Sequence, residues 1–227
     1  MEMPLTVKAI LFDIDGTLVD SNPQQVETWD IVFRREGLTF DRQTIHDQIG
    51  KGADMLIPAL VPEGDEAQRD RLAAAHGALS KGSYLDGVRP FRGARDLLAA
   101  AHAAGQQVVL ASSASKDELD HYLDLLDARD PVAATTSADD VERTKPAPDI
   151  FAVALTKLAS VEPAKAIAVG DTPYDVEPAK RCGVDTIALR SGGFSDAQLR
   201  DAGALRLYDD VAALLAGYNG SPLARRS

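Results

Sequence analysis

The chain has 227 residues, of which 45% are hydrophobic and 26% charged, and this fits one large α/β domain or one domain with a smaller insertion. Its net charge of −11 argues against nucleic acid and anionic membranes as partners, so positive charge for an anionic substrate must be supplied locally. No apolar stretch approaches the ~20 residues that span a bilayer, and the start Met1-Glu2-Met3-Pro4 lacks signal-peptide features, so we expect a cytoplasmic protein.

The first predicted element is a buried strand over residues 8–12, an apolar run that ends in Asp13, Asp15 and Gly16. In a parallel α/β sheet, ligands bind beyond the carboxyl ends of the strands. One carboxylate there can attack phosphorus as a nucleophile, while the other protonates the leaving oxygen and later activates water. Asp-x-Asp-Gly is also a common turn at a strand end, so both interpretations stay open at this point.

Residues 23–80 show apolar positions at helical spacing and no strand-like run. The apolar positions include Val26, Trp29, Val32, Phe33, Ile45, Ile49, Leu56, Leu60, Leu72 and Leu79. Hinges are expected near residues 20–22 and 83–88, where Gly82, Gly87 and Pro90 interrupt regular structure. The pattern predicts a helical cap over residues 21–87, inserted after the first strand and able to act as a lid.

Beyond residue 92, strands alternate with helices, which indicates βαβ units and a doubly wound parallel sheet. Helices are expected over 94–104, 116–126, 149–160 and 175–182, and strands over 107–111, 132–136, 166–169, 186–189 and 205–208. The predicted α/β core therefore comprises residues 1–20 and 88–227, with 218–227 as a frayed tail. Cys182, the lone cysteine, suits a reducing compartment and is interpreted as a small buried side chain at a helix end.

Three later strand ends carry polar residues. The second strand is followed by Ser112 and Ser113, whose hydroxyl and backbone N–H groups before a helix could bind an anion. Ser115 with Glu118 can form the capping box of that helix, and both roles are compatible. Lys145 lies before Pro146 and Pro148, which stiffen the backbone around it, although a solvated lysine is the ordinary alternative.

The fourth strand end reads Gly170-Asp171-Thr172-Pro173-Tyr174-Asp175. Oxygen ligands at a strand end suit Mg²⁺, which takes one or two carboxylates together with waters and substrate phosphate. Asp175 could equally be the N-cap of the following helix. The residues by themselves leave the two roles of Asp175 open.

Four motifs in this order resemble those of the haloacid dehalogenase-like hydrolase superfamily, in particular its phosphoglycolate phosphatase and β-phosphoglucomutase branch. The motifs are Asp13-x-Asp15-Gly16-Thr17, Ser112, Lys145-Pro146 and Gly170-Asp171-x-x-x-Asp175. The resemblance covers nearly the whole chain. It implies a Rossmann-like α/β core with an inserted helical cap, and phosphoryl transfer through an aspartyl phosphate.

The resemblance also implies a role for each matching residue. Asp13 would be the nucleophile and a Mg²⁺ ligand, and Asp15 the general acid and base, which binds the metal through its backbone carbonyl. Asp171 would hold Mg²⁺, and Asp175 would be a ligand or would orient water and Lys145.

The same resemblance assigns the phosphate contacts. Ser112 would bind the transferring phosphoryl group and Lys145 would stabilise its charge. The backbone at Ile14 and Ser113 is expected to help hold the phosphate.

Within this superfamily, dehalogenases and phosphonatases lack an acid at the position of Asp15. A phosphate ester needs a proton on its leaving group and a carbon–halogen bond does not, so the resemblance argues against dehalogenation for this chain. The region 110–151 is similar to the sugar-phosphate mutases, notably Ser115-Lys116 and the segment from Lys145. These mutases typically carry a histidine where this chain has Gln25, and an aliphatic residue where it has Thr17. These departures favour transfer to water.

The loop Ile49-Gly50-Lys51-Gly52-Ala53 resembles the substrate-specificity loop of the family. Gly50 and Lys51 are candidates for binding the substrate, since loops on a scaffold often carry function. A glycine-flanked lysine can also be simply solvated, and this alternative stays open.

The sequence thus predicts a Mg²⁺-dependent phosphatase that hydrolyses a small phosphomonoester through Asp13. The alternatives are a sugar-phosphate mutase of the β-phosphoglucomutase type and a non-catalytic phospho-binding or interaction module. The expected partner is a small phosphorylated metabolite, with no nucleic acid and no membrane, and the expected state is a monomer or homodimer.

Overall fold

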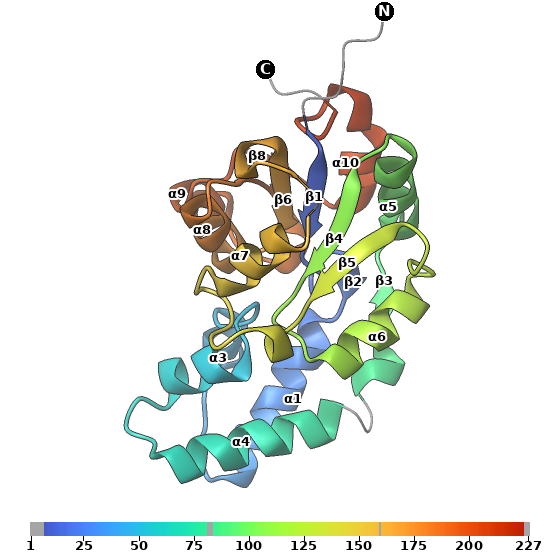
Figure 1. Ribbon diagram of the computed structural model, residues 1–227. Coiled ribbons are helices and arrows are strands. Elements are labelled where there is room, and N and C mark those ends of the chain that lie inside the picture. Colours follow the sequence, from blue (N-terminus) through green and yellow to red (C-terminus); the bar gives the residue numbers. More distant parts are fainter. Residues whose placement is uncertain (1–6, 81–83, 159, 225–227) are drawn as a thin grey trace, which may run out of the picture.

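The computed structural model describes residues 7–80, 84–158 and 160–224, and its centre is a six-stranded parallel sheet (Figure 1). The strands are β1 (Ala9–Phe12), β4 (Gln107–Ala111), β5 (Val132–Thr136), β6 (Ala166–Gly170), β7 (Asp185–Leu189) and β8 (Arg206–Tyr208), in the order β5-β4-β1-β6-β7-β8. The first strand is therefore central, and the switch in strand order lies beside it. The predicted doubly wound α/β fold is confirmed.

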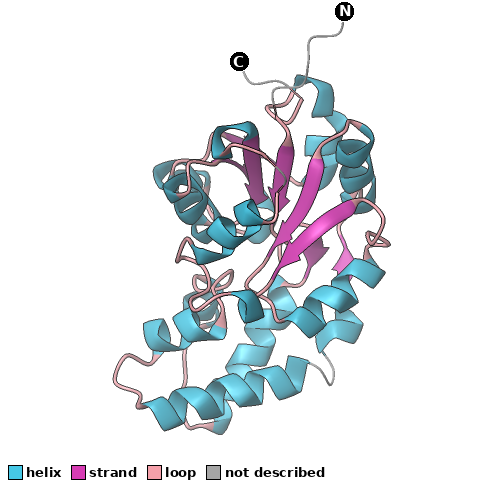
Figure 2. Cartoon of the chain, in the orientation of Figure 1, coloured by secondary structure: helices cyan, strands magenta, loops and turns pink. Residues whose placement is uncertain are grey.

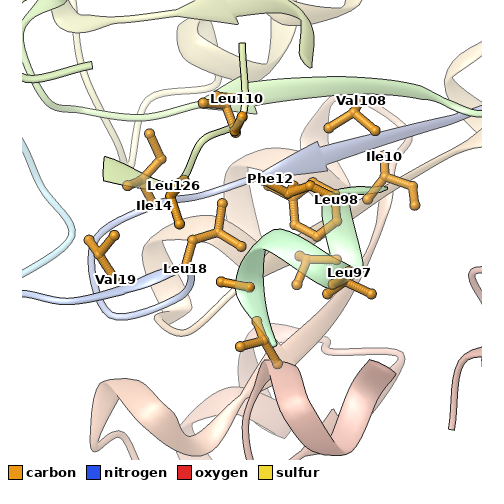
Figure 3. Packing of buried hydrophobic residues seen from close by; sticks show 14 of the residues in the cluster. Ile10, Phe12, Ile14, Leu18, Val19, Leu97, Leu98, Val108, Leu110 and Leu126 are labelled. Carbon is orange, nitrogen blue, oxygen red and sulfur yellow. The ribbon is translucent and has the colours of Figure 1, made fainter. Parts of the chain in front are cut away.

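Helices cover both faces of the sheet (Figure 2). They are α5 (Ala94–Ala103), α6 (Lys116–Leu125), α7 (Asp149–Thr156), α8 (Pro173–Arg181), α9 (Asp196–Ala202) and α10 (Val211–Ala216). Side chains alternate across β1 as a strand requires, so Ile10 and Phe12 pack with Leu97 and Leu98 of α5 (Figure 3). Leu11 joins a second cluster on the opposite face.

A separate group of helices lies beyond the carboxyl ends of β4 and β5 (Figure 1). It consists of α1 (Asn22–Arg35), α2 (Arg42–His46), α3 (Ala53–Leu60) and α4 (Glu66–Leu79). These helices bury a core of their own, which contains Trp29, Phe33, Leu56 and Leu72. The short strands β2 (Val19–Asp20) and β3 (Arg89–Pro90) pair antiparallel where the chain enters and leaves this group. The arrangement supports a cap over residues 21–87, whose boundaries stay a prediction.

Several boundaries differ from the sequence prediction. Helix α7 ends at Thr156, whereas the apolar pattern predicted a helix to residue 160. The pairing of β2 with β3 and the helices α9 and α10 were not predicted, because these elements are too short to show a clear period.

The predicted frayed tail is wrong for residues 218–224. Leu223 is fully buried, and its carbonyl oxygen accepts a hydrogen bond of 2.7 Å from Gln106 Nε2. The hydroxyl of Tyr218 donates to Gln106 Oε1 at 2.5 Å. These long-range contacts hold a segment whose composition is typical of a loop, and residues 225–227 lie outside the described part of the chain.

Within the described residues, no helix has both the length and the apolar character that crossing a membrane requires.

Candidate active site

The loop after β1 is built around the carbonyl oxygen of Ile14, which accepts hydrogen bonds from the backbone N–H groups of Thr17, Leu18 and Val19. This tight turn needs a positive φ at Gly16, which is 77°. A Cβ at Gly16 would lie 2.2 Å from Oδ2 of Asp171, so only glycine allows the loop to approach the end of β6 so closely.

Lys145 connects two carboxylates at the centre of the site. Its Nζ donates hydrogen bonds to Asp13 Oδ1 at 2.5 Å and to Asp175 Oδ1 at 2.7 Å, and its side chain is fully buried. Burial alone would lower the pKa of Lys145, but the attraction of Asp13 and Asp175 outweighs it and the pKa is raised. Lys145 is therefore a fixed positive charge, and the alternative of a solvated lysine is excluded.

Asp13 lies directly at the carboxyl end of β1, and its backbone N–H still bonds the carbonyl of Val169 at 2.8 Å. Burial raises the pKa of Asp13 to about 7, with Asp175 and Asp15 adding to the rise and Lys145 opposing it. The surroundings of the Asp13 carboxylate therefore favour binding of a proton or another cation to it.

Asp171 is held by two side chains from the first motif and α1. Thr17 Oγ1 donates to Asp171 Oδ1 at 2.6 Å, and Asn22 Nδ2 lies 3.4 Å from Oδ2. Asp171 is fully buried, and burial together with the charges of Asp13 and Asp175 raises its pKa.

One oxygen from each of Asp13, Asp171 and Asp175 lies within 4.8 Å of the others. Lys145 brings a single positive charge to these three buried carboxylates. Hard oxygen ligands gathered at this spacing suit Mg²⁺. The donor set therefore fits a divalent cation.

The alternative that Asp175 is the N-cap of the following helix is wrong, because Thr172 is the N-cap of α8 and Asp175 is the third residue of the helix. Its Oδ2 accepts hydrogen bonds from the backbone N–H and hydroxyl of Thr172, which completes the capping box of α8. Its Oδ1 accepts from Lys145. Asp175 thus orients Lys145, and its service as a direct metal ligand stays a prediction.

Asp15 is surrounded by hydroxyl groups that the sequence did not point to. Its Oδ1 accepts hydrogen bonds from Ser21 Oγ at 2.6 Å, from Tyr122 OH at 2.9 Å and from Tyr84 OH at 3.2 Å. The two tyrosine hydroxyls lie 3.3 Å apart. Ser21, where the chain enters the cap, Tyr84, where it leaves the cap, and Tyr122 of α6 therefore fix the carboxyl of Asp15 in one position.

The serines after β4 are placed as expected near the first motif. Ser112 is buried and its Oγ accepts a hydrogen bond from the N–H of Ala114 at 3.0 Å. Ser113 Oγ donates to the carbonyl of Gly50 at 3.2 Å and accepts from the N–H of Lys145 at 3.4 Å. Ser115 forms the predicted capping box with Glu118. Contacts of Ser112, Ser113 and Ile14 with phosphate stay predictions.

The loop between α2 and α3 docks on the residue before Lys145. Thr144 Oγ1 accepts a hydrogen bond of 2.9 Å from the N–H of Gly52. Asp54 accepts from the N–H of Thr144 at 2.9 Å and also from its hydroxyl. This contact between cap and core was not predicted, since Thr144 and Asp54 are 90 residues apart.

Lys51 lies in the same loop and is half-buried. Its Nζ donates to Gln48 Oε1 at 2.5 Å and lies 4.5 Å from the centre of the Tyr174 ring. Burial lowers the pKa of Lys51. The ammonium group of Lys51 is therefore held by Gln48 and Tyr174 and is not freely solvated. Its contact with substrate stays a prediction.

The site opens into a cavity of about 630 Å³ between the strand ends and the cap. Asp13, Asp15, Gly50, Lys51, Ser112 and Ser113 all line it. This volume is in the range of small-molecule sites. The structure thus brings the predicted first, second and cap-loop motifs to one cavity, with Lys145, Asp171 and Asp175 buried behind Asp13.

Comparison with known proteins agrees with this geometry. The family described as haloacid dehalogenase-like hydrolase matches residues 10–189. A phosphoglycolate phosphatase of Rhodospirillum rubrum is 32% identical over 219 residues, which cover 91% of this chain and 89% of the relative. A validoxylamine A 7'-phosphate phosphatase of Streptomyces hygroscopicus is 30% identical over 182 residues, covering 80% of this chain and 85% of the relative.

Among solved structures, a hydrolase from Pseudomonas syringae superposes with a TM-score of 0.87 at 29% identity, covering 94% of this chain and 98% of the other. The fold and site define a doubly wound α/β enzyme with buried carboxylates at the carboxyl ends of its strands. The chain belongs to the haloacid dehalogenase-like hydrolase family. The expected family is confirmed, and the expected class of enzyme, a phosphatase, is the class named for these two relatives.

Proposed function

We propose that the protein is a Mg²⁺-dependent phosphatase that hydrolyses a small phosphomonoester through an aspartyl phosphate on Asp13. The observation that carries the proposal is the contact of the Asp13 carboxylate with buried Lys145, because Asp13 and Asp15 line the same cavity. A nucleophile, a fixed positive charge and an acid thus converge on one substrate position.

In the first step, an oxygen of Asp13 attacks phosphorus, and the bond between phosphorus and the ester oxygen breaks. Asp15 gives its proton to that leaving oxygen. In the second step, Asp15 takes a proton from water, whose oxygen attacks phosphorus, and the bond from Asp13 to phosphorus breaks. Inorganic phosphate leaves, and both carboxylates return to their starting states.

The remaining residues bind the transferring phosphoryl group and keep Asp15 in position. Lys145 neutralises the oxygens of the transferring group, and Ser112 with the backbone N–H groups of Ile14 and Ser113 binds them. Ser21, Tyr84 and Tyr122 hold Asp15 toward the cavity.

Asp13, Asp171 and the backbone carbonyl of Asp15 would hold Mg²⁺, with Asp175 as a further ligand or as the residue that orients Lys145. When bound, the ion supplies positive charge that shields the attacking carboxylate from the phosphate anion. The carboxylate spacing supports this proposal.

We propose water as the acceptor because the cavity wall carries Gln25 where the related sugar mutases have a histidine. An amide cannot exchange a proton with a sugar hydroxyl near neutral pH. Gly50 and Lys51 would contact the leaving group of the substrate, which we expect to be a small phosphorylated metabolite. We expect the protein to act in the cytoplasm as a monomer or a homodimer.

The test is release of phosphate from p-nitrophenyl phosphate with Mg²⁺ and with EDTA. Activity should require Mg²⁺ and disappear in Asp13→Asn. Asp130→Asn is the matched control, because Asp130 is exposed and precedes β5 at the opposite end of the sheet. Equal activity of Asp13→Asn and the parent would refute the mechanism, and binding of phosphate without turnover would favour a non-catalytic module.

A further inference from the structure

Lys145 brings the buried positive charge of the site, yet its backbone lies outside regular secondary structure. Residues 141–148 precede α7 and belong to no helix or strand. Such a segment has no regular ladder of backbone hydrogen bonds, so its position depends on individual contacts of its N–H groups and side chains. The partners of Thr144 and Lys145 therefore decide how firmly the ammonium group is placed.

Thr144 is joined to the cap by three hydrogen bonds. Its backbone N–H donates to Asp54 Oδ2 at 2.9 Å, and its hydroxyl donates to Asp54 Oδ1. The same hydroxyl oxygen accepts from the N–H of Gly52 at 2.9 Å. Thr144 is only 4% exposed, whereas Asp54 is an exposed residue in the first turn of α3. The cap therefore provides the partner for both hydrogen-bond donors of a buried core residue.

Gly52 allows the cap loop to approach Thr144 closely. A Cβ built on Gly52 would lie 2.6 Å from Cγ2 of Thr144 and still closer to its Oγ1, so a larger residue would push the loop away. The φ of Gly52 is −76°, which other residues also adopt. The need for glycine at this position is therefore explained by the contact with Thr144 and not by the backbone conformation.

The backbone N–H of Lys145 is connected to the same cap loop through a serine. It donates to Ser113 Oγ at 3.4 Å, and Ser113 Oγ donates to the carbonyl of Gly50 at 3.2 Å. The consecutive N–H groups of Thr144 and Lys145 are thus both held by residues 50–54 of the cap, one directly and one through Ser113. Moving this loop would disturb both anchors of the segment that carries Lys145.

We propose that Thr144 and Asp54 are positioning residues for Lys145, which keep its ammonium group in place against Asp13 while the phosphoryl group transfers. Asp54 lines the cavity, but both of its carboxylate oxygens already accept hydrogen bonds from Thr144. A shift of a catalytic group by about 1 Å can lower a rate about 100-fold, so such anchors control turnover without touching the substrate. The inference rests on the proposed phosphatase function, in which Lys145 stabilises the transferring group.

Two substitutions at Thr144 test the contact. Thr144→Val removes the hydroxyl and keeps the shape of the side chain, whereas Thr144→Ser keeps the hydroxyl. With p-nitrophenyl phosphate, we expect Thr144→Val to lower kcat about tenfold with little change in KM, and Thr144→Ser to stay close to the parent. Thr156→Val is the matched control, because the hydroxyl of Thr156 donates to the carbonyl of Val153 at the exposed far end of α7.

Inhibition by orthovanadate, an analogue of the transferring phosphoryl group, separates positioning from stability. In Thr144→Val, the inhibition constant of orthovanadate should rise by about the factor by which kcat falls, because both depend on the charge that meets the transferring group. A purely structural role of Thr144 would lower the midpoint of thermal unfolding and leave the inhibition constant and kcat of the folded enzyme unchanged. That result would overturn the proposal.

Asp54→Asn tests the cap side of the contact and serves if Thr144→Val fails to fold. It should also lower kcat, and the double variant should lose little more than the larger single loss, because both changes break one contact. The loss should be the same factor with p-nitrophenyl phosphate and with phosphoglycolate. Glu66→Gln is the control, since Glu66 is an exposed carboxylate in the first turn of α4. A loss confined to one ester would show that Asp54 contacts the leaving group and would contradict the positioning role.

The positioning role and the phosphatase function fail in different ways. If the parent releases no phosphate from either ester, the phosphatase function is removed. If the parent is active and the Thr144 and Asp54 variants keep its kcat and its inhibition by orthovanadate, only the positioning role is removed.

Discussion

The hydroxyl of Tyr122 donates a hydrogen bond of 2.9 Å to Oδ1 of Asp15, across 107 positions of sequence. Tyr122 comes from α6, which packs on the sheet, and Asp15 from the loop after β1. Tyr84 donates to the same oxygen from the segment where the chain leaves the cap. The position of the proposed acid therefore depends on the packing of a core helix and on the path of the chain out of the cap.

We expect Tyr122→Phe to lower kcat about tenfold while changing KM little, because it removes one hydrogen bond that holds Asp15, worth about 1.5 kcal/mol with a charged acceptor. Steady-state kinetics with p-nitrophenyl phosphate measures this. Tyr218→Phe is the control, since it also removes a tyrosine hydroxyl that donates a hydrogen bond, here to Gln106 and away from Asp15. A normal kcat for Tyr122→Phe would mean that Ser21 and Tyr84 suffice.

Lys145→Met should destabilise the fold by about 3–5 kcal/mol, because it leaves the buried carboxylates of Asp13 and Asp175 without their positive partner. Urea unfolding without metal measures the loss. Lys157→Met is the control: Lys157 pairs with Asp140 at the surface and donates to the carbonyl of Thr135, so the change should cost only about 0–1 kcal/mol. Equal losses in the two variants would show that burial of the Lys145 pair has no energetic consequence.

Stability of the metal-free protein should depend on pH through Asp13. Its folded pKa of about 7 exceeds the ordinary value of 3.8, so the unfolded state releases this proton first. The contribution of Asp13 to stability is therefore fully present below the unfolded pKa and is lost as pH rises through about 7. Between these values, the free energy of unfolding of the parent should fall relative to that of Asp13→Asn, which cannot titrate.

The measurement is urea unfolding of both proteins in EDTA at several pH values, and the same series with Mg²⁺. The ion competes with protons for the carboxylates, so it should reduce the pH dependence. A difference between parent and variant that does not change with pH would contradict the raised pKa.

Thr17→Val should weaken Mg²⁺ binding about 10–100-fold, because it removes the hydroxyl that orients Asp171 at 2.6 Å. Isothermal titration calorimetry with MgCl₂ measures the Mg²⁺ affinity directly and does not depend on enzyme activity. Thr186→Val is a matched control, since Thr186 Oγ1 is buried without a hydrogen-bond partner among the described residues. Equal affinities of the two variants would remove Thr17 from the metal site.

The sequence alone sufficed to predict which strand ends carry the residues of the candidate site. Apolar runs that stop at Asp13, Ser112 and Asp171 predict strands, and in a parallel sheet their carboxyl ends meet at one edge. This local information, with Lys145 held between prolines, sufficed to predict a common site for the motifs. Their meeting is confirmed by the contact of Lys145 with Asp13 and by the shared carboxylate cluster.

Only the tertiary structure decided what surrounds those motifs. Neither the hydroxyl of Tyr122 on Asp15 nor the stack of His76 on Trp29 has a local signal, because a buried aromatic side chain at helical spacing looks the same whether it fills a core or faces a site. The same holds for Leu223, which looked like part of a loose tail and is fully buried. Such contacts depend on how helices dock on the sheet and on each other, and that docking is set by packing between segments far apart in the chain.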